Sequence, residues 1–248
     1  MGNLYLVRHG QASFGAEDYD NLSELGHKQA ERLGAYFKQK NRQFDAVITG
    51  TLRRHTQTWQ GIAKGAGFVH EPLQMPSLNE YDSYAVIATI HPQKLEKPDT
   101  PEMYRHHFRL LKDGLTQWMN GVVSPAGMPS YVDFQQGVVG ALDHVRKNHV
   151  TEKDDDKNNK KSGNVLIVSS GGPIATAVGH ILGTTPEATI ELNLRIRNCS
   201  ITEFAFTPKR HMLVTYNTLP HFDGSSIRHP IRQFLQMRQR VEIGRAHV

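Results

Sequence analysis

The chain has 248 residues, enough for one α/β domain with an elaboration, and 29 Lys and Arg against 24 Asp and Glu give a mildly basic formal charge of +5. No one-sided basic run points to a nucleic-acid partner, and no apolar stretch approaches the roughly 20 residues of a membrane helix. With one cysteine, Cys199, and no signal-peptide pattern, the sequence predicts a cytoplasmic protein without an internal disulfide.

The first part of the chain alternates between strand and helix patterns. Residues 3–7 form a short apolar run that predicts a buried strand, and residues 45–49 predict a second one. Between them Ser23 has the character of a helix N-cap and precedes an apolar face. That face consists of Leu25, Gln29, Leu33 and Phe37. A second helix is expected over residues 51–63, with Leu52, His55, Trp59 and Ile62 on one side.

The middle of the chain has a weaker pattern. Residues 71–130 contain several prolines, so we expect a variable insert of loops near the functional site. Helices are predicted over residues 102–120 and 131–148. The charged residues 152–163, in which both signs are mixed, predict a surface loop.

The last part contains the clearest strand, residues 164–169, followed by a helix that opens at Gly171 and runs to about Leu182. Residues 201–206 and 212–216 are expected to pair as a hairpin. Alternating strands and helices predict an α/β fold with three layers, in which helices flank a largely parallel central sheet. We interpret residues 1–241 as a single domain and residues 242–248 as a non-native tail.

Polar residues follow three of the predicted strands directly. They are Arg8-His9-Gly10, Thr49-Gly50-Thr51 and Ser169-Ser170-Gly171-Gly172. Because ligands of parallel sheets bind beyond the carboxyl ends of the strands, we expect these segments to converge on one site.

The order of these motifs resembles the histidine phosphatase superfamily, whose fold is phosphoglycerate mutase-like. The resemblance rests on Arg8-His9-Gly10, on Leu22 to Ala30, on Leu52-x-Arg54-x-x-Gln57-Thr58 and on Leu78-Asn79-Glu80. It implies that His9 accepts a phosphoryl group, that Arg8 and Arg54 bind the phosphate, and that Glu80 donates a proton, with Asp82 as a rival. These residue types suit phosphoryl transfer, which needs a nucleophile, charge neutralisation and an acid.

One position departs from the family pattern. The family places a second histidine before Gly-Gly, where this chain has Ser170. Three alternatives stay open. Ser170 and the amides of Gly171 and Gly172 bind the phosphoryl group themselves; or His221, or less suitably His180, replaces the histidine; or the site binds phosphate esters and turns them over poorly.

Most of the 14 histidines are interpreted as ordinary helix or loop residues. These include His27, His55, His70, His106, His107 and His144. No Cys/His cluster or dinucleotide fingerprint is present, so we predict neither a metal nor a cofactor.

The sequence therefore predicts a metal-independent phosphomonoesterase that acts on a small phosphorylated substrate or a phosphoprotein. A phosphoglycerate-mutase-type phosphotransferase and a catalytically weak phosphoester-binding or interaction module are the alternatives. The sequence gives no signal for the oligomeric state. Residues proposed to line the substrate pocket are Tyr81, Tyr84, Tyr104, Arg105 and Arg109.

Overall fold

The computed structural model describes residues 1–13, 20–93, 95–96, 98–149 and 163–222. In this part of the chain a 6-stranded sheet has the order β3-β2-β4-β1-β5-β6. Its strands are β1 (Gly2–Arg8), β2 (Ala46–Thr49), β3 (Leu73–Gln74), β4 (Asn164–Ser169), β5 (Ile201–Phe206) and β6 (His211–Thr218). The predicted loop 152–163, apart from its last residue, and the predicted tail 242–248 lie outside the described residues.

The pairing of the strands confirms a largely parallel sheet with a C-terminal hairpin. β1, β4, β2 and β3 are parallel neighbours, whereas β5 runs antiparallel to both β1 and β6. β1 and β4 pair without a shift from Asn3↔Asn164 to Arg8↔Ser169. β3 was not predicted, because it consists of only 2 exposed residues within the proline-rich region.

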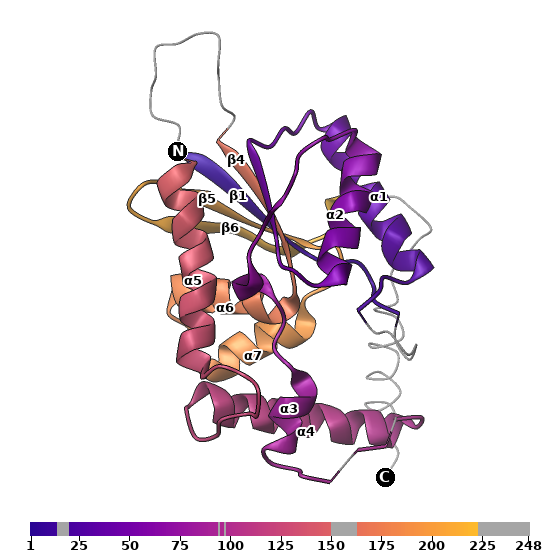
Figure 1. The fold of residues 1–248 in the computed structure, drawn as a ribbon, viewed down its shortest axis with the longest axis vertical. Helices are drawn as coiled ribbons and strands as arrows, with labels where there is room; N and C mark the ends of the chain where they lie inside the picture. The colour runs from indigo at the N-terminus through magenta and orange to yellow at the C-terminus, as the bar shows by residue number, and fades with distance from the viewer. Residues whose placement is uncertain (14–19, 94, 97, 150–162, 223–248) are drawn as a thin grey trace, which may run out of the picture.

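Helices cover both faces of this sheet, as predicted for a three-layer fold. α1 and α2 lie together on one face, and α5 and α6 lie on the other (Figure 1). The helices are α1 (Glu24–Gln39), α2 (Arg53–Ala66), α3 (Ser83–Ala88), α4 (Pro101–Met119), α5 (Tyr131–Asn148), α6 (Gly171–Leu182) and α7 (Pro186–Arg195), with short 3-10 turns η1 (Pro76–Leu78) and η2 (Pro220–Phe222).

Successive side chains of β1 alternate between the two faces of the sheet. Leu4 and Leu6 pack with residues of α5 and α6, whereas Tyr5 and Val7 pack with residues of α1 and α2. All of them are almost fully buried. Because successive side chains of a strand point to opposite faces, one short strand joins both halves of the core.

α1 and α2 pack closely against each other in the second half of α2. A Cβ atom at Gly34 would lie 2.1 Å from the Ile62 carbonyl oxygen, and one at Gly65 would lie 2.0 Å from that of Glu31. Only glycine permits this approach of two helix backbones. α2 begins at Arg53, only a few residues after β2 ends at Thr49, so its first turn lies at the edge of the sheet where the predicted functional residues gather.

The predicted insert 71–130 takes part in a small hydrophobic core, together with α7. Val86 of α3, Leu115 and Trp118 of α4 and Ile190 of α7 are buried together. α4 lies within one residue of the predicted range 102–120 at each end, and it has Thr100 as its N-cap and Pro101 in its first turn. α3 and α7 were not predicted. Among the described residues, no helix combines the length and apolar character needed to cross a membrane.

Candidate active site

His9 lies at the carboxyl end of the central strand. Its backbone N–H donates to the Ser169 carbonyl at 2.9 Å, which extends the pairing of β1 with β4 by one residue. On the other side of β4, the Gly50 N–H donates to the Val168 carbonyl at 3.1 Å. The ends of β1, β4 and β2 therefore converge, as the sequence predicts, and bring His9, Gly50 and Ser170 to one place.

The imidazole of His9 is buried, with 4% of the residue exposed, and its orientation is defined. Its Nδ1 lies 2.7 Å from the carbonyl oxygen of Gly10. A carbonyl can only accept, so Nδ1 carries the proton and Nε2 of the neutral ring keeps its lone pair. Burial, followed by the charge of Arg8, holds the pKa of His9 well below its usual value. The ring is therefore neutral near pH 7, with the lone pair on Nε2.

Thr58 connects the His9 loop to α2. Its hydroxyl oxygen accepts from the Gly10 N–H at 3.0 Å, and the hydroxyl donates to the Arg54 carbonyl at 2.7 Å. The preceding residue, Gln57, accepts from the Leu22 N–H with its side chain at 2.7 Å. The Gln-Thr pair of the sequence motif thus holds the loop that carries His9 against the first turns of α2.

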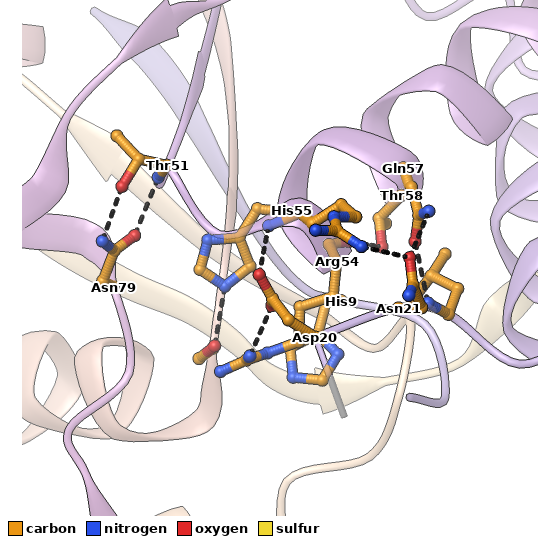
Figure 2. Close-up of polar contacts among 12 residues, drawn as sticks. His9, Asp20, Asn21, Thr51, Arg54, His55, Gln57, Thr58 and Asn79 are labelled. Carbon is orange, nitrogen blue, oxygen red and sulfur yellow. Dashed lines mark hydrogen bonds and ion pairs between the residues drawn. The ribbon is translucent and has the colours of Figure 1, made fainter. Parts of the chain in front are cut away.

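The two candidate arginines of α2 differ in burial. Arg54 is 7% exposed, and its Nη1 forms an ion pair of 2.7 Å with Asp20, whereas Arg53 is exposed. The same Asp20 carboxylate accepts from the Arg53 backbone N–H at 2.8 Å, at the start of the helix (Figure 2). This arrangement supports Arg54 over Arg53 as the phosphate ligand. Asp20 itself was not predicted as part of the site.

Arg8 lies beside His9 on the other side. Its guanidinium donates to the Ile196 carbonyl, in the segment between α7 and β5. Cys199 in the same segment has φ 53° and donates its N–H to the Arg8 carbonyl at 2.9 Å. This tight turn therefore supports both the side chain and the backbone of Arg8.

Glu80 reaches the start of α6. Its carboxyl oxygens accept from the Gly172 N–H at 3.0 and 3.2 Å. Burial raises the pKa of Glu80, while that hydrogen bond and the charges of Arg8 and Arg54 lower it in part. Gly172 lies two residues after Ser170, whose hydroxyl contacts His55 beside His9, so Glu80 belongs to the same site. The Gly172 amide was expected to donate to a bound phosphoryl group, but it donates to the Glu80 carboxyl group.

The rival acid Asp82 has a structural role. It is exposed, and its carboxylate caps α3 by accepting from the Tyr84 and Ala85 N–H groups at 2.8 and 3.1 Å. Of the proposed pocket residues, Tyr81 lies nearest the site, because a Cβ at Gly172 would be 2.7 Å from its ring. Tyr84 is 80% exposed and points away from the core.

The histidine that faces Ser170 is His55. Its Nε2 lies 2.7 Å from the Ser170 hydroxyl oxygen, and its ring centroid is 5.8 Å from that of His9. Figure 2 shows His55 between Asn79 and His9. His55 lies on a helix, as the sequence predicts, but its buried contact with Ser170 was not predicted. Its place on the buried side of the helix was predicted, but nothing local in the sequence indicates its partner.

The two histidines considered as replacements for the missing second histidine, His221 and His180, lie elsewhere in the structure. His221 is buried against α1, where its ring is 6.2 Å from Tyr36 and 4.3 Å from Phe222. His180 is exposed near the end of α6. Within the described part of the chain, no group of three or more His, Cys, Asp or Glu side chains is arranged to hold a metal ion.

A family model for the histidine phosphatase superfamily (branch 1) matches residues 4–219. The chain belongs to this superfamily. A 2,3-bisphosphoglycerate-dependent phosphoglycerate mutase of Mesorhizobium japonicum is 27% identical over 199 residues, which are 77% of this chain and 86% of the relative. The mitochondrial serine/threonine-protein phosphatase Pgam5 of Caenorhabditis briggsae is 30% identical over 110 residues, 44% of this chain and 37% of the relative.

Solved structures of phosphatases share the fold. One is a phosphoserine phosphatase of Entamoeba histolytica bound to phosphoserine, with a TM-score of 0.56, 20% identity and coverage of 89% of this chain and 99% of that chain. Another is a mycobacterial glucosyl-3-phosphoglycerate phosphatase, with a TM-score of 0.59, 20% identity and coverage of 88% and 99%. The phosphoglycerate mutase-like fold predicted from the sequence is thereby confirmed.

Proposed function

We propose that this chain is a phosphomonoesterase that transfers a phosphoryl group from a small phosphorylated substrate or a phosphoprotein to His9 and then to water. The state of His9 supports this most directly. The ring is buried and neutral, Nδ1–H is held by the Gly10 carbonyl, and Arg8 and Arg54 lie close enough to lower its pKa. A nucleophile with a fixed lone pair beside two cations suits attack on a phosphate ester.

In the first step, Nε2 of His9 attacks phosphorus, and the N–P bond forms as the P–O bond to the leaving group breaks. Arg8 and Arg54 hold the equatorial oxygens, helped by the Ser170 hydroxyl and the Gly171 amide. Glu80 gives its proton to the leaving oxygen. The raised pKa of Glu80 suits this role, because an acid must keep its proton near neutrality.

In the second step, a water molecule attacks the phosphohistidine. The carboxylate of Glu80 takes one proton from the water, the new P–O bond forms, and the N–P bond breaks. Inorganic phosphate leaves, while His9 is again neutral and Glu80 again protonated. The balance of this sequence calls for no metal or cofactor.

A phosphoglycerate-mutase-type transfer is the second candidate, favoured by the similarity to the mutase of Mesorhizobium japonicum. A mutase returns the phosphoryl group of phospho-His9 to another oxygen of the same sugar acid instead of to water. The two activities differ in product. With 3-phosphoglycerate, a mutase releases 2-phosphoglycerate, whereas a phosphatase releases inorganic phosphate and glycerate.

The test is hydrolysis of p-nitrophenyl phosphate with chelator present, from about pH 5 to 8. His9→Ala is compared with the parent, and His27→Ala, an exposed histidine of α1, is the matched control. Chelator-resistant turnover that disappears in His9→Ala and persists in His27→Ala is expected. Turnover that survives in His9→Ala would refute the mechanism. A parent that binds phosphate without turning over would favour the weak phosphoester-binding or interaction module.

A further inference from the structure

Ser170 is placed to cap α6 but does not do so. It is the N-cap residue of that helix, with extended backbone angles, and its side chain accepts no hydrogen bond from the helix amides. A serine at this position usually caps its helix, and loss of such a cap costs about 1 kcal/mol. Here the fully buried hydroxyl turns to Nε2 of His55 at 2.7 Å instead. This departure from the local preference indicates a functional use.

The surroundings of His55 determine which atom donates. Among the described residues, Nδ1 of the buried ring has no hydrogen-bond partner. Nδ1 has no partner in either tautomer, but an unpaired buried N–H is rarer than an unpaired buried acceptor, which favours a proton on Nε2 with the Ser170 oxygen as its acceptor. The neutral ring therefore carries its proton on Nε2 and donates to Ser170. Because the serine oxygen accepts from His55, its own hydrogen is directed away from His55.

We propose that His55 is a positioning residue that orients the Ser170 hydroxyl as a donor to the transferred phosphoryl group, so that the pair replaces the second histidine expected at position 170. The inference rests on the proposed function. The hydroxyl, aligned by His55, would donate to a phosphoryl oxygen on His9, whose ring centroid is 5.8 Å from that of His55. A chain of two donors in a buried site is stronger than a freely rotating hydroxyl.

Gly50 is part of this arrangement. A Cβ atom at this position would lie 2.2 Å from Nδ1 of His55 and 2.7 Å from Oδ1 of Asn79. Any larger residue would therefore push the ring of His55 off Ser170. Gly50→Ala displaces the imidazole while leaving both partners in the chain, and so offers a second way to break the pair.

The experiment is a double-mutant cycle on turnover of p-nitrophenyl phosphate. His55→Phe keeps an aromatic ring but no donor, Ser170→Ala removes the hydroxyl, and the double variant removes both. We expect each single change to lower kcat about 10²-fold, the loss typical of one preorganised donor, and the double change to lower it no further. His55→Gln, whose amide can donate, should recover about 10-fold of the loss, while Gly50→Ala should match His55→Phe.

Two readouts separate this role from a merely structural one. Nitrogen-15 NMR of the folded parent should show His55 protonated on Nε2, with that signal shifting in Ser170→Ala. The inference would be overturned if the double variant lost the product of the two single losses in kcat. It would also be overturned if a folded His55→Phe kept a kcat within about twofold of the parent, or if the NMR spectrum placed the proton on Nδ1. If the parent shows no turnover, the proposed function fails. The same four proteins are then compared by their Kd for inorganic phosphate. Additive changes in binding free energy would then overturn the pairing of His55 with Ser170, independently of the proposed function.

Discussion

Acid should destabilise this protein partly through the buried His55. Burial and the charge of Arg54 lower the pKa of His55 from 6.5 to about 3 in the folded chain. Below about pH 6.5 the unfolded chain therefore binds a proton on this histidine that the folded chain does not bind. Proton uptake then favours unfolding, so stability falls as the pH drops, and the fall from this group ends only near pH 3.

The size of this effect follows from the shift. Each pH unit between the two pKa values changes the free energy of unfolding by about 1.4 kcal/mol per histidine, so His55 contributes roughly 2 kcal/mol between pH 6.5 and pH 5. This is a large share of the roughly 5–15 kcal/mol by which a domain is stable. His9, whose pKa is also lowered by burial, acts in the same direction.

Urea unfolding of the parent and of His55→Phe at several pH values between 7 and 5 measures the effect. The variant should lose about 2 kcal/mol less than the parent over this range, because the titration of this ring is removed while the other titrating residues are still present. His27→Phe, which replaces an exposed histidine of α1, is the matched control for the change from imidazole to phenyl. Parallel curves for the parent and His55→Phe would refute the assignment of a neutral, buried ring.

Other consequences of the geometry are open to measurement. Gly172→Ala places a Cβ 2.2 Å from the Glu80 carboxyl oxygen, so kcat should fall about 10²-fold or more through loss of the acid, while circular dichroism shows α6 intact. Asp20→Asn removes the negative charge beside Arg54 but keeps an acceptor for the start of α2. Inorganic phosphate should therefore bind about two- to fivefold more tightly in calorimetry, and weaker binding would contradict this reasoning. Phe204→Ala should lower the free energy of unfolding by about 3–5 kcal/mol in urea, since the ring is fully buried between the sheet and the helices, and a loss under about 1 kcal/mol would be incompatible with that packing.

The sequence predicted the central elements because their patterns are strong. The buried run of β4 and the apolar face of α1 define their own type and place, and Ser23 caps α1 as expected. α3 and α7 escaped prediction because short helices depend on tertiary packing more than on local preference. α3 has 6 residues, and its buried Val86 is covered by α4, which follows later in the chain.

Some residues of the candidate site could likewise be predicted from the sequence, and others could not. The positions of Arg8, His9 and Arg54 follow from strand ends and helix starts that the sequence marks. The contact between His55 and Ser170 was not predicted, because Ser170 lies 115 positions later in the chain and no local pattern relates residues so far apart. Asp20 was missed for a similar reason, since its partner Arg54 is 34 positions away and the two meet only when α2 packs beside the His9 loop.

The place of β1 in the sheet has a consequence for how the protein is made. β1 leaves the ribosome before both of its neighbours in the sheet, because β4 and β5 begin only at Asn164 and Ile201. At roughly 5–20 residues per second, the segment carrying His9 waits on the order of ten seconds or longer without a partner on either edge. Its apolar residues are a target for chaperones during that interval. A nascent chain halted before β4 emerges contains His9 but lacks the strand whose Ser169 carbonyl accepts from the His9 N–H, so the candidate site cannot assemble until β4 has been synthesised.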